Sequence, residues 1–177
     1  MEVNGYTIKP HADLTGADLS SAELWKADLR GVNLSRANLD STNLSFANLS
    51  HANLSGANLE GANLEGANLS CENPSHENPS PDDRLMASLF GPKEPPPERT
   101  NLSGASMRGA NLSGANLSWA DLTGVDLTGA DLVDADLSNA NLDLTNLSYT
   151  NLLGAKLEAH GNTNMTGAMM PDGTIYE

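Results

Sequence analysis

The sequence predicts an all-β fold, a solenoid in which the chain winds into stacked coils around one shared interior. Leucine occupies every fifth position from 14 to 69 without a miss, and every fifth position from 102 to 157 except at Met107. The residue two places before each of these central residues is small, and it is nearly always alanine. Turn-forming Gly, Ser, Asn and Asp fill most of the positions between them.

A period of five fits neither regular element alone. On an α-helix with 3.6 residues per turn, leucines spaced by five would spread around every face. On a strand with period two, successive leucines would alternate between the two faces. All of the leucines can point inward only if the chain turns once per five residues. Stacked coils of such short sides then pair their backbones at about 4.8 Å.

Tandem units such as Ala52-Asn53-Leu54-Ser55-Gly56 resemble the pentapeptide-repeat family, which is abundant in cyanobacteria. The resemblance covers residues 12–159 apart from one interruption, and again 163–170. It implies a right-handed quadrilateral β-helix with four pentapeptides, or twenty residues, in each coil. Central leucines then form a buried column along the axis, represented by Leu14, Leu34, Leu54, Leu112, Leu132 and Leu152.

One domain spanning residues 1–177 accounts for this pattern. Residues 12–71 and 100–159 each supply three coils, residues 72–99 form an insertion, and residues 160–177 form a last partial coil with a cap. Val3, Tyr6 and Ile8 alternate with polar residues, so we expect an edge strand that covers the first coil. At the other end, Pro171-Asp172-Gly173 is typical of a closing turn.

The insertion holds seven of the nine prolines and has a helical signal of its own. Ser80-Pro81-Asp82-Asp83 is typical of a helix start, and Gly91-Pro92 of its end, so a short amphipathic helix is expected near 81–90. Its apolar side chains follow helical spacing: Leu85, Met86, Leu89 and Phe90. They either cover the flank of the solenoid or form a docking finger, our candidate binding site for a protein partner.

The residues just before the central leucines are Asp, Glu or Asn in nearly every repeat. Acids fill these positions in the first coil, from Asp13 to Asp28, and again at the four positions from Asp121 to Asp136. Four consecutive repeats make one coil, so each set is expected to form an acidic ring. Between the rings the same positions carry Asn, which we expect to stack in side-chain ladders where carboxylates would repel one another.

No recognisable catalytic, metal-binding or cofactor-binding motif is present, which predicts a protein that is not an enzyme. The four histidines are scattered, and the single cysteine, Cys71, excludes an intrachain disulfide. No hydrophobic leader and no membrane-length apolar run occur, so we expect a cytoplasmic protein that does not bind membranes. A net charge of −14 argues against direct binding to nucleic acid.

These observations favour a rigid protein–protein interaction scaffold with an unknown protein partner. The alternative is an acidic mimic of DNA that inhibits an enzyme such as gyrase, as some members of the family do. The two repeat regions together carry a net charge of −9. That is about half of the roughly 17 charges on the same length of DNA.

Two groups of residues are predicted to lie outside the solenoid where they could bind. Lys26 and Phe46 occupy equivalent positions in successive coils, and Trp25 lies on the same face. This arrangement fits either a cation–π contact or surface stacking alone. Leu144, Tyr149 and Leu153 project from the last full coil and form a candidate dimer face. The alternative is that the C-terminal tail covers them. The chain is therefore expected to be a monomer or a weak homodimer.

Overall fold

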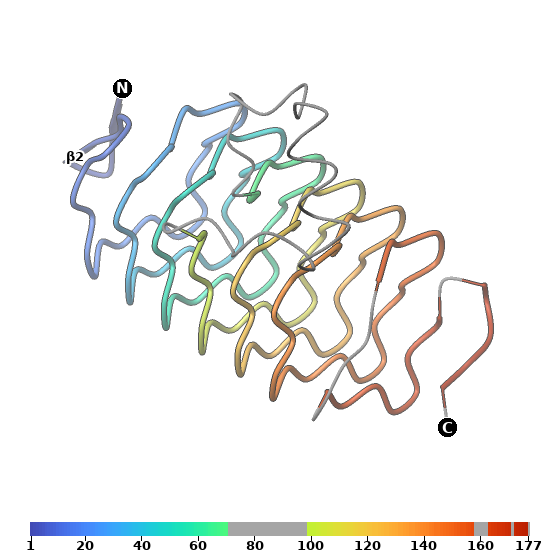
Figure 1. The fold of residues 1–177 in the computed structure, drawn as a ribbon. Helices are drawn as coiled ribbons and strands as arrows, with labels where there is room; N and C mark the ends of the chain where they lie inside the picture. The colour runs from blue at the N-terminus through green and yellow to red at the C-terminus, as the bar shows by residue number, and fades with distance from the viewer. Residues whose placement is uncertain (71–98, 158–162, 171, 177) are drawn as a thin grey trace, which may run out of the picture.

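A computed structural model describes residues 1–70, 99–157, 163–170 and 172–176, and this part of the chain winds into a four-sided solenoid (Figure 1). Parallel bridges join residues twenty apart, four in each coil, as in Asp13↔Asn33, Asp18↔Asn38, Glu23↔Asn43 and Asp28↔Asn48. The sides are numbered by their central residues in the first coil: Leu14, Leu19, Leu24 and Leu29. No helix occurs in the described residues. The right-handed winding stays a prediction.

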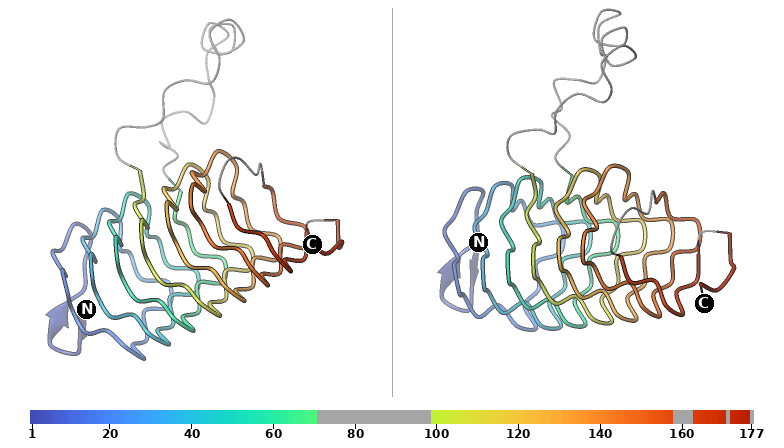
Figure 2. Two further views of the ribbon diagram at one scale, coloured as in Figure 1. Left: turned by 90° about the horizontal axis from the view of Figure 1, so that it is seen from below. Right: turned by 60° about the horizontal axis from the view of Figure 1, so that its bottom comes forward.

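Six coils stack along one axis, and the two chain ends lie at opposite ends of the stack (Figure 2). The coils comprise residues 12–31, 32–51, 52–70, 100–119, 120–139 and 140–157. Each side ends in a turn, in which the amide of Ala17, for example, donates to the carbonyl of Leu14 at 3.0 Å. The third turn residue, Gly16, has φ +67°, as type II turns require. We call this third residue the corner position.

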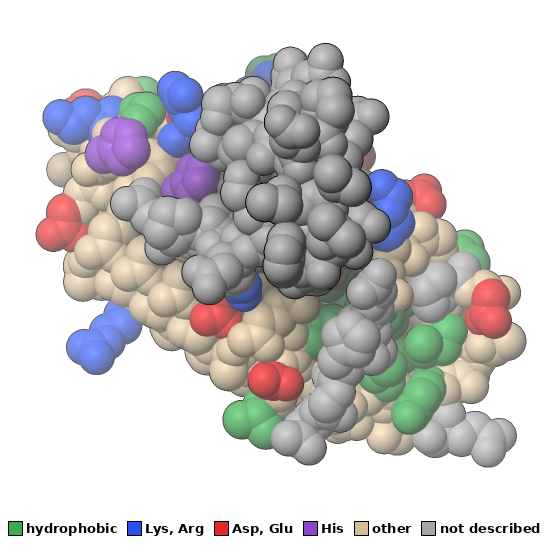
Figure 3. All heavy atoms as spheres, viewed as in Figure 1, with side chains coloured by type: hydrophobic (Ala, Val, Ile, Leu, Met, Phe, Trp, Pro, Cys, Tyr) green, Lys and Arg blue, Asp and Glu red, His purple; other side chains and the backbone are tan. Residues whose placement is uncertain are grey.

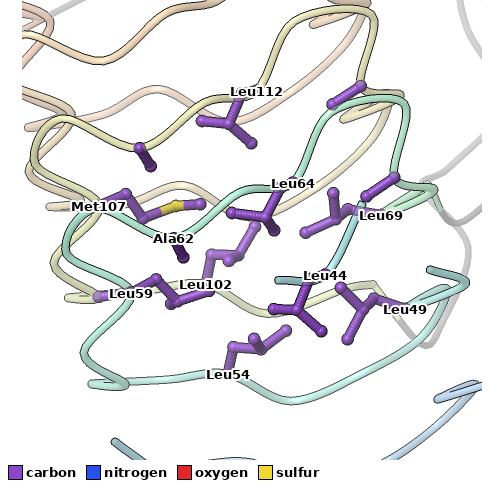
Figure 4. Packing of buried hydrophobic residues seen from close by; sticks show 14 of the residues in the cluster. Leu44, Leu49, Leu54, Leu59, Ala62, Leu64, Leu69, Leu102, Met107 and Leu112 are labelled. Atoms are coloured by element: carbon purple, nitrogen blue, oxygen red, sulfur yellow. The ribbon is translucent and has the colours of Figure 1, made fainter. Parts of the chain in front are cut away.

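The central leucines fill the interior, as the period of five predicted. Leu34, Leu54, Leu112, Leu132 and Leu152 are fully buried, and Leu14 is almost so. Figure 4 shows leucines of successive coils packed in layers, with Met107 in one of the leucine positions. The small residues before them complete the core, and Ala57, for example, is 1% exposed.

The insertion leaves the solenoid at the corner after the fourth side, and the coil register continues across it. Asn53 pairs with Asn101, which is 48 residues away and not twenty, so 28 residues lie outside the ladder. Thr100 closes the break, because its hydroxyl accepts the His51 amide at 2.9 Å. At the equivalent corner below, the Gly31 amide donates to the carbonyl of Ser50. The helix expected at 81–90 lies outside the described residues.

The N-terminal cap is a hairpin, not the single edge strand expected from the sequence. Strand β1 (Glu2–Val3) pairs antiparallel with β2 (Tyr6–Thr7). Asn4 and Gly5 between them both have positive φ, the backbone of a type I′ turn. The alternation of apolar residues predicts one strand, but the Asn4-Gly5 turn divides it into two. Ile8, which follows the hairpin, is buried against the first coil.

The C-terminal end is a partial coil followed by an antiparallel return, where the sequence suggested a partial coil and a closing turn. Asn146 pairs with Asn164 and Asn151 with Met169, so the spacing drops from twenty to eighteen residues. Ile175 then pairs antiparallel with Met169, and the Tyr176 amide donates to the Ala168 carbonyl at 2.9 Å. This return satisfies backbone groups that an open last coil would leave unpaired.

Candidate interaction surfaces

Asparagine ladders run along the outside of the solenoid. The Nδ2 group of Asn58 donates to Oδ1 of Asn38 at 3.2 Å, and Asn38 donates in turn to Asp18 at 3.1 Å. The Oδ1 of Asn58 also accepts the amide of Glu60, two residues later in the same turn, at 3.1 Å. The predicted ladders are therefore confirmed, and their bonds have a direction: the asparagines that bond a neighbouring coil donate to the coil on their N-terminal side.

This direction explains where the acidic rings lie. Asp and Glu carboxylates accept hydrogen bonds but cannot donate them. No coil lies below the first coil, so acids there give up no hydrogen bond to a lower coil. They still accept from the second coil, as Glu23 accepts from Asn43 at 2.7 Å. In the fifth coil Asp121 and Asp126 accept from Asn141 and Asn146 above but can give nothing to the fourth coil. On these two sides the second ring therefore donates no side-chain hydrogen bond to the fourth coil.

Two basic residues compensate the ring of the fifth coil. Arg108 lies 3.0 Å from Asp126, and Lys156 lies 2.8 Å from Asp136. Partial burial works against ionisation of Asp136, but hydrogen bonds from Lys156 and Ser138 outweigh it and lower the pKa of this carboxyl. The pKa of Asp126 is lowered in the same way by Thr128 and Arg108, against its burial. Ion pairs and turn hydrogen bonds thus already engage these carboxylates.

An aromatic cluster projects from the third side near the N-terminal end. The Lys26 ammonium lies 4.3 Å from the centroid of the Trp25 ring, so the cation–π contact is present. Phe46 occupies the corner position above Lys26, and about half of its side chain is exposed. Its ring covers Gly66 of the next coil, where an added Cβ would come within 2.6 Å of it.

The three residues of the candidate dimer face are all exposed around the last full coil. Leu144 is 65% exposed, Tyr149 70% and Leu153 44%. The closing segment reaches two of them, since Tyr149 lies over Gly167 and Leu153 lies near Gly173. It leaves most of Tyr149 uncovered, so covering by the tail is only partial. Figure 3 shows hydrophobic side chains gathered near this end of the molecule.

Two of these residues also have an unfavourable backbone. Leu144 and Tyr149 stand at corner positions with φ +59°, a conformation that costs an L-residue about 1 kcal/mol or more. Gly104 and Gly124 occupy the corner below Leu144, and Gly109 and Gly129 the corner below Tyr149. Apolar side chains thus replace the glycines that suit these corners best, and they point to solvent.

The closing segment contributes two further exposed apolar side chains near this surface, Ile175 and Tyr176. The sequence placed both in a closing turn and did not assign them to the surface. Ile175 and Tyr176 lie near the candidate dimer face because the chain returns antiparallel to Met169. The repeat pattern does not predict this return.

The candidate partner-binding residues Leu85, Met86, Leu89 and Phe90 lie outside the described residues. Within the described ranges, no group of three or more His, Cys, Asp or Glu side chains is placed to hold a metal ion. The same part of the chain contains no helix of the length and apolarity that crossing a membrane requires.

Comparisons with known proteins agree with this geometry. A family profile described as "Pentapeptide repeats" matches in eight copies, over residues 10–36, 33–70, 98–129 and 126–159. The crystal structure of HetL, from the cyanobacterium Nostoc sp. strain PCC 7120, is 35% identical, with a TM-score of 0.61. The match covers 94% of this chain and 73% of HetL, which is described as involved in the regulation of heterocyst differentiation.

Two further solved structures are more distant. Rfr23 from the cyanobacterium Cyanothece 51142 is 26% identical over 88% of each chain, with a TM-score of 0.44. A trypsin-treated form of QnrB1, a plasmid-mediated fluoroquinolone resistance protein, is 20% identical over 91% of this chain and 69% of its own, with a TM-score of 0.46. No curated protein matches this chain.

Proposed function

Because the chain belongs to the pentapeptide repeat family, we propose that it is a non-catalytic scaffold that works through protein–protein contacts. The solenoid holds each outward side chain on a backbone fixed by hydrogen bonds to the coils on both sides. A surface of this kind is preorganised, so binding loses little conformational entropy. The regulatory role described for HetL supports a function in binding rather than in turnover.

The observation that carries the proposal is the exposure of two large apolar side chains on the last full coil, Leu144 at 65% and Tyr149 at 70%. Exposed apolar side chains gathered at one end of a protein mark an interaction surface. Leu153, on the next side of the same coil, is a third exposed apolar residue. We assign these three residues to an interface, and we propose a second copy of the chain as its first occupant, in a weak homodimer. The proposed location is the cytoplasm.

The double variant Leu144→Gly with Tyr149→Gly tests this assignment. Glycine suits φ +59° better than leucine or tyrosine, so the variant should melt at an unchanged or higher temperature. Sedimentation velocity should show association of the wild type that grows with concentration, and loss of that association in the variant. Phe46→Gly is the matched control, because Phe46 is also an exposed apolar residue at a corner, with φ +58°. It should leave association unchanged.

A wild type that stays monomeric at several hundred micromolar would overturn the dimer assignment. Association that survives in the double glycine variant would place the interface elsewhere.

The distribution of charge does not favour mimicry of DNA. A duplex carries charge evenly along its axis. Here the acids before the central leucines gather in the first and fifth coils, while the same positions in the second, third and fourth coils carry Asn or Ser. Arg30, Arg108 and Lys156 further neutralise part of the acidic charge through ion pairs. The scaffold proposal therefore needs no gyrase-like target.

A further inference from the structure

Exposed apolar side chains gather on the third side of the solenoid. Eight large apolar side chains are exposed in the described residues, and six of them stand on this side, at its corners or on the antiparallel return that pairs with it: Trp25, Phe46, Tyr149, Leu153, Ile175 and Tyr176. On the other three sides, each described residue directly after a central residue is polar. The third side is therefore the apolar face of the protein.

The apolar groups of this face lie near its two ends, with a carboxylate between them. Trp25 and Phe46 belong to the first and second coils, and Val133 and Leu153 to the fifth and sixth. Glu65 of the third coil lies between the groups, and its carbonyl accepts the Phe46 amide at 2.8 Å. Five steps of about 4.8 Å separate the first coil from the sixth, so the face is about 24 Å long.

The same face is acidic. In the six coils it carries four acids and one base, a net charge of −3: Glu23, Glu65, Asp131, Asp134 and Lys26. Lys26 already lies over Trp25, and Glu23 accepts a hydrogen bond from Asn43. The other three acids have no ion-pair partner in the described part of the chain. These three carboxylates can pair with cations of a bound partner.

The main chain of the face is already used by the solenoid. Amides and carbonyls at its ladder positions bond the coils on both sides, as where the Asn63 amide donates to the Thr42 carbonyl and the Asn63 carbonyl accepts the Leu44 amide. An added strand would therefore find no free backbone groups on the face, whereas an α-helix satisfies its own backbone hydrogen bonds. The segment that fits is a helix that binds through its side chains.

We propose that the third side binds an amphipathic α-helix of a partner protein, with apolar residues near both ends of its binding stripe and basic residues in the middle. The inference rests on the scaffold role proposed above, but not on the dimer. Trp25 and Phe46 contact one apolar end of the helix, and Val133 and Leu153 contact the other. Glu65 pairs with a Lys or Arg between them.

A helix that lies along the solenoid axis matches the spacing of the coils. Helix positions 1, 4, 8, 11, 15 and 18 share one face, and each residue advances the helix by 1.5 Å. These positions therefore fall within about 2 Å of successive coils at 4.8 Å. Positions 8 and 11 lie at the third and fourth coils in either direction of the helix, so a Lys at both places one of them opposite Glu65.

The probe is an 18-residue peptide with Leu at positions 1, 4, 15 and 18, Lys at 8 and 11, and Ala or Gln elsewhere as helix formers. Fluorescence anisotropy of the labelled peptide, titrated with the full chain, should show saturable binding. The same peptide with Glu in place of Lys should bind at least about tenfold more weakly. Equal binding of the two peptides, or no binding at millimolar protein, would overturn the proposal.

Trp25→Ser with Phe46→Gly removes one apolar group. Serine stands in the same column at Ser45 and Ser113, and glycine suits φ +58° better than phenylalanine, so the melting temperature should stay close to that of the wild type. Binding of the Lys peptide should weaken at least about tenfold. Unchanged binding would contradict the proposal. Should this variant fail to fold, Val133→Ser makes the same test at the other end.

Two single variants separate charge from apolar contact. Glu65→Ser should reduce the preference for the Lys peptide over the Glu peptide, and a full preference in this variant would exclude Glu65 as the pairing residue. Leu144→Gly is the matched control, because Leu144 is an exposed apolar residue at a corner outside the third side, with φ +59°. It should leave peptide binding unchanged.

The helix site and the dimer can fail separately. Peptide titrations use protein at a concentration where the wild type sediments as a monomer, and the dimer is tested by sedimentation without peptide. A peptide that does not bind leaves the sedimentation result standing. Self-association of the wild type that is abolished by Trp25→Ser with Phe46→Gly would assign the third side to a second copy and overturn the helix proposal.

Discussion

Replacing Asn58 with Asp tests whether the asparagine ladder stabilises the solenoid. The change keeps the oxygen that accepts the Glu60 amide and removes the Nδ2 donor that bonds Asn38 at 3.2 Å. It also places a carboxylate oxygen against the Oδ1 of Asn38. A neutral hydrogen bond contributes about 0.5–1.5 kcal/mol net, and the facing oxygens add to its loss. We expect a destabilisation of about 1–2 kcal/mol.

Thermal melting followed by circular dichroism measures this effect. For a chain of this size, 1 kcal/mol shifts the melting temperature by about 2–4 °C, so Asn58→Asp should melt roughly 2–8 °C lower. Asp131→Asn is the reverse change in the fifth coil, where Asp131 pairs with Asn111 below it. The new amide can donate to Asn111, so this variant should melt higher.

Asp13→Asn is the control, because no coil lies below Asp13 to receive a hydrogen bond. Its melting temperature at pH 7 should not rise, because hydrogen bonds from Thr15 lower the pKa of Asp13 and favour the carboxylate that the substitution removes. If Asn58→Asp melted like the wild type, or if Asp131→Asn were destabilised, then the ladder bonds would not stabilise the fold and the explanation of the acidic rings would be wrong.

Two further predictions concern the corners and pH. Gly66→Ala and Gly124→Ala place a side chain at corners with φ +61° and +65°, but only the former meets an aromatic ring, that of Phe46. Gly66→Ala should therefore melt lower than Gly124→Ala, and adding Phe46→Gly to both variants should remove the difference. If the difference in melting temperature stayed the same with Phe46→Gly as without it, the contact would be contradicted. The pKa of Asp136 is lowered in the folded state from 3.8, so its stabilisation is present above that value and is lost as the pH falls through the folded-state pKa. Urea unfolding between about pH 5 and pH 2 should show a shallower loss of stability for Asp136→Asn, and an unchanged slope would show that this carboxyl does not contribute.

The architecture and the core could be predicted from the sequence because every repeat has the same pattern of apolar, small and turn-forming residues. A leucine every five residues, with an alanine two places before it, can be buried only if the chain turns at each repeat. The positions from Leu14 to Leu152 are buried as this reasoning requires. The ladders could be predicted for the same reason. In a coil of twenty residues, residues twenty apart have the same place in the repeat and lie one above the other.

The candidate surfaces were predicted only as separate residues. Trp25, Leu144 and Tyr149 could be identified as exposed because they stand at outward positions of the repeat. The positive φ of Leu144 and Tyr149, the rings lying over Gly66 and Gly167, and the partial covering of Leu153 were not evident from the sequence. Such contacts join side chains that differ from repeat to repeat, so the repeat pattern cannot predict them.

What the sequence by itself determined is the winding of the chain, because that depends on a pattern that every repeat carries. Only the tertiary structure decided the features at the ends of the solenoid and at the insertion, where the repeat pattern stops. The hairpin at Asn4 and Gly5 covers the second side, where the Asn4 side chain donates to the Asp18 carbonyl. At the corner before residue 100, the Thr100 hydroxyl accepts the His51 amide in place of a backbone carbonyl. These features arise from single contacts between distant residues, and hydrogen bonds at the ends and at the break must be satisfied without help from a neighbouring repeat.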